Sequence, residues 1–178
     1  MRKQKPVALY VFTIFVIVFG SLYLYTRPGS IETLYDFADL TDIDMVGASV
    51  RVYEGDLNET LYATDWFQPG QAEYDELIQL LRESTFQRSL KTLKPLPEVR
   101  QSPHLQPGMY VLEVYYHNDV NGFLLQSFYG ETTICFYDHS LGEQYINIAN
   151  ESDWEQTCFD FVMEHGAKQE TIIMDTAA

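Results

Sequence analysis

The chain has 178 residues and a formal net charge of −15. Such a negative surface repels phosphate backbones, which argues against a nucleic-acid-binding domain. Aromatic residues make up 15% of the chain, which argues against intrinsic disorder. The length suits one folded domain in addition to a terminal segment.

Residues 7–25 form an apolar run without a charged residue. As a helix this run is roughly 28 Å long, close to the thickness of the hydrocarbon core of a bilayer. Three basic residues precede it and only Arg27 follows closely, so the positive-inside rule predicts a cytoplasmic N-terminus. The predicted segments are a cytoplasmic N-terminus at 1–6, a transmembrane helix at 7–25, a juxtamembrane segment at 26–42, an extracytoplasmic domain at 43–168 and a frayed tail at 169–178.

A cleaved signal peptide is the alternative reading of the N-terminus, with cleavage after Gly20. Against it, the apolar run continues to Tyr25 and contains no Ala-x-Ala site. Both readings export the remainder of the chain. The expected location is therefore the cell membrane, with the domain outside.

Hydrophobic periodicity predicts the elements of the first half of the exported part. Apolar residues spaced by three and four positions indicate helices, and strict alternation indicates half-buried strands. Ser30 can cap the first helix. Four prolines between positions 95 and 107 rule out a central strand there. The predicted elements are a short helix at 31–38, strands at 46–53 and 61–64, a helix at 71–84 and a strand at 86–90.

The second half predicts a meander of four strands closed by a helix. Asn121-Gly122 is a strong hairpin signal between two alternating runs. Ser152 and Glu155 fit a capping box before the last helix, and Gly166 is placed to stop it. The predicted strands lie at 110–116, 123–128, 132–137 and 145–148, and the helix continues to His165.

This order of elements predicts an α+β fold, in which two amphipathic helices cover one face of an antiparallel sheet of about five to six strands. The stretch Tyr145-Ile146-Asn147-Ile148, followed by a helix through Cys158, resembles the closing part of small uncharacterised ectodomains. Membrane-anchored proteins and lipoproteins of Gram-positive bacteria carry such ectodomains. The resemblance covers the order of elements over residues 43–165 and implies no functional residues.

Two cysteines, Cys135 and Cys158, lie in the exported part. An extracytoplasmic location permits a disulfide between them. The alternative is two buried thiols that pack as small apolar groups. No ligand spacing around them indicates a metal site.

Acidic residues and histidines offer two further candidate sites. Asp39, Asp42 and Asp44 are close enough in sequence to hold Ca²⁺, although their spacing is not that of an EF-hand. The alternative is a solvated acidic linker. His117 and His139 flank hairpin strands, where a pair of imidazoles would bind Zn²⁺ or sense mild acid. The alternative is that both are solvated.

Basic residues are concentrated in one stretch of the exported part, which has 7 basic and 26 acidic residues and a charge of −19. Five of the seven lie between positions 82 and 100, beside the proline-rich loop. They predict a docking patch for an anionic peptide, a wall polymer or an acidic partner surface. Alternatively, they protect the edge strand at 86–90 from aggregation. The five are Arg82, Arg88, Lys91, Lys94 and Arg100.

No hydrolase, metalloprotease, phosphate-loop or dinucleotide motif occurs in the chain. The favoured hypothesis is therefore a membrane-anchored, non-enzymatic domain that binds or senses a partner at the cell surface. Expected partners are the bilayer, through residues 7–25, and an unknown protein or anionic ligand. No cofactor and no nucleic acid is expected. The alternatives are a hydrolase with scattered site residues around a histidine, and a structural subunit of a membrane complex.

Overall fold

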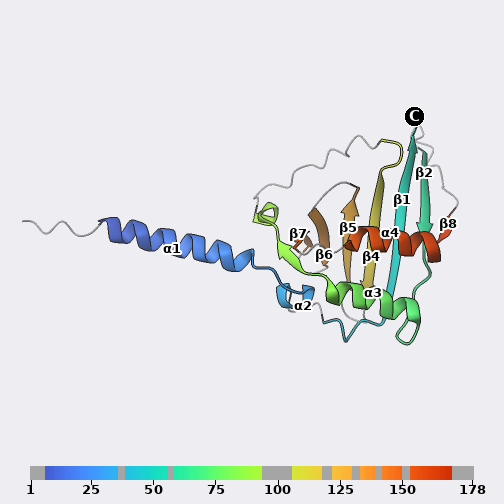
Figure 1. Cartoon of the computed structure of the whole chain (residues 1–178), viewed down its shortest axis with the longest axis horizontal. Helices are drawn as coiled ribbons and strands as arrows, with labels where there is room; N and C mark the ends of the chain where they lie inside the picture. Colours follow the sequence, from blue (N-terminus) through green and yellow to red (C-terminus); the bar gives the residue numbers. More distant parts are fainter. Residues whose placement is uncertain are drawn as a thin grey trace, which may run out of the picture.

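The computed structural model describes residues 7–35, 39–55, 58–93, 106–117, 122–129, 133–138, 142–149 and 153–169. In this part of the chain, one long helix projects from an α+β domain (Figure 1). The α+β class predicted from the sequence is therefore confirmed.

One antiparallel sheet contains all the named strands in the order β3-β7-β6-β5-β4-β1-β2-β8. The predicted meander is confirmed, because β4 to β7 pair consecutively. In the part of the chain that the structure describes, the sheet has eight strands, more than the predicted five to six. They are β1 (Met45–Gly55), β2 (Asn58–Ala63), β3 (Phe86–Arg88), β4 (Tyr110–His117), β5 (Gly122–Phe128), β6 (Thr133–Asp138), β7 (Gly142–Ile148) and β8 (Ala167–Gln169).

One edge strand, β8, was not predicted from the sequence, whereas the other, β3, corresponds to the strand predicted at 86–90. Each of β3 and β8 has three residues. β8 pairs with β2, and its last residue, Gln169, lies in the segment predicted as a frayed tail. All three of its residues are exposed, so it has no alternation of buried and exposed positions that a pattern could reveal. β3 ends two residues earlier than predicted, and the 3-10 helix η1 (Leu90–Leu93) follows it.

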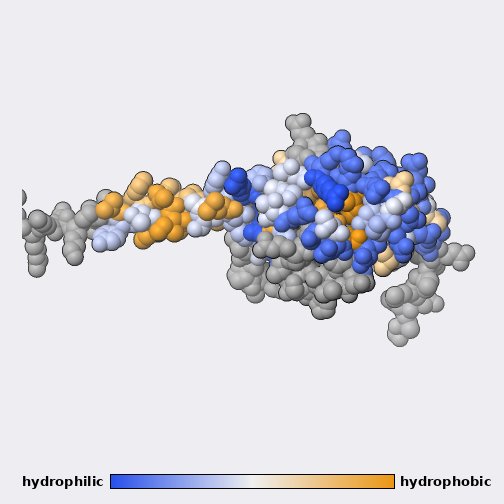
Figure 2. All heavy atoms as spheres, turned by 90° about the horizontal axis from the view of Figure 1, so that it is seen from below, coloured by the Kyte–Doolittle hydropathy of each residue, from blue (hydrophilic) through white to orange (hydrophobic). Residues whose placement is uncertain are grey.

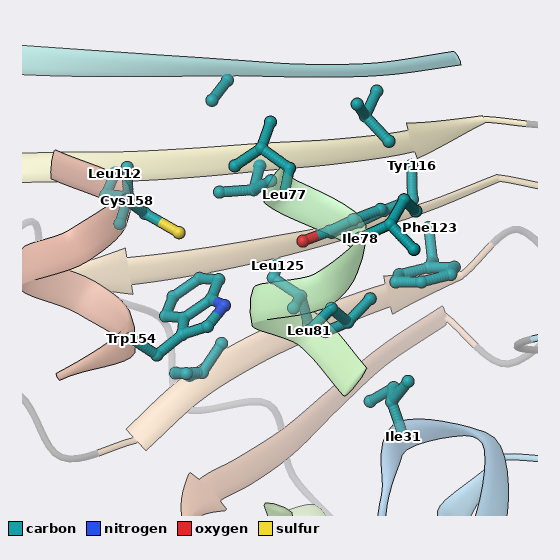
Figure 3. Packing of buried hydrophobic residues seen from close by; sticks show 14 of the residues in the cluster. Ile31, Leu77, Ile78, Leu81, Leu112, Tyr116, Phe123, Leu125, Trp154 and Cys158 are labelled. Carbon is teal, nitrogen blue, oxygen red and sulfur yellow. The ribbon is translucent and has the colours of Figure 1, made fainter. Parts of the chain in front are cut away.

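Two helices, α3 (Ala72–Glu83) and α4 (Trp154–His165), lie across the same face of the sheet (Figure 1). Their buried side chains form one core with the inward residues of the strands (Figure 3). Leu77 and Leu81 of α3 and Trp154 of α4 are fully buried. Burying a side chain of this size stabilises the fold by roughly 1.5–3 kcal/mol. The predicted placement of both helices on one face is confirmed.

The ends of α4 differ from the predicted caps. Asp153 is the N-cap residue and makes no side-chain cap bond, while Ser152 lies outside the described residues. The carboxylate of Glu155 instead accepts hydrogen bonds from Tyr110 and Ser127, so the predicted capping box was wrong. Gly166 does end the helix, with a φ of −85°. A Cβ there would lie 2.5 Å from the carbonyl oxygen of Val162, so close approach favours glycine.

The predicted juxtamembrane segment is part of the domain. Ser30 caps the four-residue helix α2 (Ile31–Leu34) by accepting a hydrogen bond from the amide of Thr33. Ile31 and Leu40 are buried in the common core. The folded unit therefore begins earlier than the predicted boundary at residue 43.

The N-terminal helix α1 (Val7–Tyr25) has 19 residues and extends away from the domain (Figure 1). Its described side chains begin at Leu9, and its large apolar residues between Leu9 and Phe19 are at least 48% exposed. Its apolar surface contrasts with the hydrophilic surface of the domain (Figure 2). Among the described residues, no helix has the length and hydropathy needed to cross a membrane.

Candidate functional site: the open face of the sheet

The sheet face opposite α3 and α4 carries a mixed aromatic and polar surface. Strand register places its positions in rows that cross β1, β4 and β5. All of these residues are partly exposed except Gly47 and Val111, which are buried, and Arg51, which is exposed. The rows are Gly47–Tyr115–Leu124, Ser49–Glu113–Gln126 and Arg51–Val111–Phe128.

Trp66 lies flat on this face at Gly47. A Cβ built on Gly47 would lie 3.2 Å from Cε3 of the indole and 3.5 Å from both Cδ2 and Cζ3. Nearly equal distances to three consecutive ring atoms place the ring face, rather than its edge, over the backbone. Trp66 is 51% exposed, so the opposite face of the ring is open to solvent.

Backbone pairing fixes the position of this tryptophan. The amides of Val46 and Phe67 donate to each other's carbonyl groups, over distances of 3.0 and 2.8 Å. Phe67 then enters the core and contacts Phe161 edge-on, with a centroid distance of 5.9 Å. Because successive side chains of an extended segment alternate, Trp66 points to the open face.

Two side chains of β4 surround the indole. Its centroid lies 6.0 Å from the ring of Tyr115 and 6.5 Å from that of His117, with steep interplanar angles of 63° and 71°. Such edge-to-face contacts are favourable arrangements of aromatic quadrupoles. They leave the outer face of Trp66 as a platform.

A carboxylate is held beside this platform. Glu113 accepts hydrogen bonds from the hydroxyl of Tyr115 and from Nε2 of Gln126, both 2.6 Å long. Burial, and next the bond to Glu113, raise the pKa of Tyr115 to about 12, so the phenol remains a donor at neutral pH. Glu113 therefore places a carboxylate on the open face, one row from the indole.

A positively charged side chain, Arg51, lies farther along the same face. Arg51 forms an ion pair with Glu59 of β2, with an N–O distance of 3.4 Å. Glu59 thereby neutralises the charge of Arg51, which lies two rows away from the indole. The arrangement favours a neutral or cationic ligand at Trp66, since an anionic ligand would face the carboxylate of Glu113.

Three of the five predicted basic residues lie in the described part of the chain, whereas Lys94 and Arg100 lie outside it. Arg82 in the last turn of α3 and Lys91 in η1 are exposed. The guanidinium carbon of Arg88 lies 5.1 Å from the ring centroid of Tyr35 and 5.5 Å from that of Tyr25. Arg88 also donates a hydrogen bond to the carbonyl of Leu34.

These contacts change the interpretation of Arg88. Its guanidinium faces two rings and a carbonyl, so it holds the end of α1 and α2 against β3. This differs from its predicted role as a ligand-binding cation. Arg82 and Lys91 remain predicted contributors to a basic surface.

Cys158 is a free thiol and is completely buried, so the predicted alternative of a disulfide with Cys135 was wrong. Burial, and next the carboxylate of Glu155, hold the pKa of this thiol well above its ordinary value. The side chain of Cys135 lies outside the described part. The alternative of a buried, apolar-like thiol is confirmed for Cys158.

The predicted acidic site does not form a metal centre in the part described. Asp39 accepts hydrogen bonds from the amide and the hydroxyl of Thr41, which lower the pKa of its carboxyl group. No group of three or more His, Cys, Asp or Glu side chains among the described residues converges as metal ligands would. Asp39, Asp42 and Asp44 therefore do not form the calcium site that the sequence offered beside the solvated acidic linker.

The described histidines lie apart in the fold. His117 ends β4 on the open face beside Trp66, whereas His165 contacts Phe161 at the end of α4, with ring centroids 4.6 Å apart and the rings tilted by 40°. His104 and His139 lie outside the described residues, so the predicted pair of His117 with His139 stays a prediction.

Comparisons with protein-family models, curated proteins and solved structures find no match. The resemblance to Gram-positive ectodomains therefore stays a prediction. Sequence reasoning missed the Trp66 platform, because its two halves are 19 positions apart (Gly47 to Trp66) and neither belongs to a known motif. The outward alternation of Gly47 along the predicted strand was the available signal, since it leaves room for a ring.

Proposed function

We propose that this chain is a membrane-anchored, extracytoplasmic domain without enzymatic activity, which binds a cationic partner on the open face of its sheet. The observation that carries the binding proposal is Trp66, whose indole lies flat on the sheet with one face open. An exposed ring on a rigid strand framework is a typical element of a recognition surface.

The apolar surface of α1 supports the anchor. Its large side chains are exposed, and lipid removes such surface from water at a gain of about 25 cal/mol per Å². The proposed span counts all 19 residues, including Val7 and Ala8, whose side chains lie outside the described part. Three basic residues before the helix and Arg27 after it favour a cytoplasmic N-terminus.

Extraction and protease protection test the anchor. Membranes that contain the chain are washed with alkaline carbonate, and intact cells without their wall are treated with protease. We expect the chain to stay in the membrane and its domain to be digested from outside. Release by carbonate would refute the anchor, and digestion only from the cytosolic face would refute the orientation.

The charge of the site supports a basic partner. Trp is the best aromatic partner for a cation, and the bound cation of a Lys or Arg side chain gains about 0.5–1 kcal/mol at an exposed site. Glu113 adds negative potential on the same face, through its hydrogen bond to Tyr115, whose ring contacts Trp66. A protein surface with exposed Lys or Arg therefore fits better than an acidic polymer.

A binding titration with the full chain in uncharged lipid nanodiscs tests this proposal. A labelled oligolysine peptide serves as the probe, and its fluorescence anisotropy reports binding. Trp66→Ala removes the platform without changing the net charge, so we expect binding to weaken about two- to fivefold. Met163→Ala on α4, which removes an exposed apolar side chain from the other face, is the matched control.

Three outcomes decide the ligand class. Equal binding by wild type and Trp66→Ala would show that oligolysine responds to net charge alone, which would refute the site. Binding of an uncharged oligosaccharide that depends on Trp66, without binding of oligolysine, would refute a cationic partner. Weaker binding of oligolysine by Trp66→Ala alone supports the proposal.

A further inference from the structure

The domain is joined closely to the end of α1. The amide of Gly29 donates to the carbonyl of Phe86 over 2.9 Å, and the amide of Phe86 donates to the carbonyl of Gly29 over 2.8 Å. The chain thus pairs with β3 immediately after the helix. Arg88 on the same strand contacts the ring of Tyr25, the last residue of α1.

These contacts define which end of the domain lies nearest to α1. Figure 1 shows α2, β3 and η1 at the end from which α1 projects, and β2 and β8 at the far side. If α1 spans a bilayer, as proposed above, the end formed by α2, β3 and η1 lies at the headgroups. This inference rests on the proposed anchor.

Basic residues are concentrated at this end, on a chain that is acidic overall. Arg27, Arg82 and Lys91 are exposed, and Arg88 lies among them with its charge shared between two rings. The described carboxylates nearby are Glu32 on α2, Asp39 beside Leu40, and Glu83 at the end of α3. The side chain of Glu32 accepts a hydrogen bond from the amide of Leu40, 3.2 Å away.

We propose that this end of the domain rests on anionic lipid headgroups of the bilayer that holds α1. Charge complementarity favours the contact, because the described basic residues at this end outnumber the described carboxylates, on a chain with a formal net charge of −15. Continuity with α1 selects lipid over a soluble acidic partner, since the bilayer surface is adjacent to Tyr25 without further association. The domain is thereby held in one orientation, with the Trp66 face available at its side.

Hydrogen–deuterium exchange of the full chain in nanodiscs tests the contact. One set of discs contains phosphatidylcholine alone, and the other contains about one-third phosphatidylglycerol. The reporters are the amides of Lys91 and Thr92, which make long hydrogen bonds of 3.3 and 3.2 Å to Ser89. We expect slower exchange in the anionic discs, and loss of the difference in about 0.5 M salt.

A double substitution, Arg27→Gln with Lys91→Gln, removes two of the proposed contacts. Each cation near an anionic surface should change the ratio of docked to undocked domain by a factor of roughly five, so this ratio should fall about 25-fold. The two kinds of disc should then give equal exchange. The matched control is Arg51→Gln with Lys168→Gln, which removes the same charge from exposed positions on β1 and β8. It should retain the difference.

The failure of this inference is distinguishable from the failure of the anchor. A chain that carbonate strips from both kinds of disc lacks the anchor. A chain that stays in the discs, but exchanges Lys91 and Thr92 equally fast in neutral and anionic lipid, lacks the headgroup contact. An equal effect of both double substitutions would also refute the contact. The difference in exchange between the discs would then depend on the net charge of the chain and not on Arg27 and Lys91.

Discussion

Replacing Arg88 by methionine should destabilise the domain by about 2–4 kcal/mol. The guanidinium lies over the rings of Tyr25 and Tyr35, and each partly desolvated cation–π contact is worth about 0.5–2 kcal/mol. Its hydrogen bond to the carbonyl of Leu34 adds about 1.5–3 kcal/mol for a charged donor. The cation–π contacts and the hydrogen bond involve the same guanidinium, so their contributions do not add fully. Methionine keeps the packing of the apolar part of the arginine side chain, which limits the loss.

Urea unfolding of the full chain in detergent, followed by far-UV circular dichroism, measures this loss. In thermal unfolding of the same samples, the melting temperature of a domain of this size should fall by about 5–15 °C. Arg51→Met is the control, because its exposed ion pair with Glu59 is worth less than about 1 kcal/mol. Arg88→Lys should be intermediate, since it keeps the charge but loses the planar group. Equal midpoints for Arg88→Met and Arg51→Met would refute this reasoning.

Three further perturbations test other parts of the fold. Glu155→Ala removes the acceptor of the buried Ser127 hydroxyl, so urea unfolding should show a loss of about 1–3 kcal/mol, against less than about 0.5 kcal/mol for the exposed Glu164→Ala. Burial raises the pKa of Tyr35 from its ordinary 10.0 to about 12, against the opposing effect of the Arg88 charge, so the phenol keeps its proton to higher pH in the folded state. Stability should therefore be intact below pH 10 and fall between about pH 10 and 12, and thermal melts of Tyr35→Phe should show a smaller fall. The buried thiol of Cys158 should react with maleimide only as the domain unfolds, and mass spectrometry that finds rapid labelling of Cys158 in native buffer would contradict its burial.

Elements that bury one face were predictable from the sequence. In α3, Tyr74, Leu77, Ile78 and Leu81 recur at the helical period, and all four are buried. The strands of the meander alternate in the same way, because one face of the sheet packs on the helices while the other is partly exposed. Burying one face of a helix or strand requires apolar residues at the period of that element, and this period can be read from the sequence.

Contacts between distant segments were not predictable in this way. Arg88 was interpreted as one member of a local run of cations, but Tyr25 and Tyr35, which lie 63 and 53 positions earlier, determine its role. The spacing of two cysteines likewise carries no information on their separation in space, and Cys158 is free. The capping-box pattern failed because Tyr110 and Ser127 compete for Glu155.

The pairing of Gly29 with Phe86 also determines where mechanical load enters the domain. Only Thr26, Arg27 and Pro28 separate α1 from this pair, so little free chain can stretch before two main-chain hydrogen bonds bear the tension. β3 passes that tension to β7 and then to the middle of the sheet. A partner that pulls on the domain would therefore displace the helix instead of extending a flexible tether.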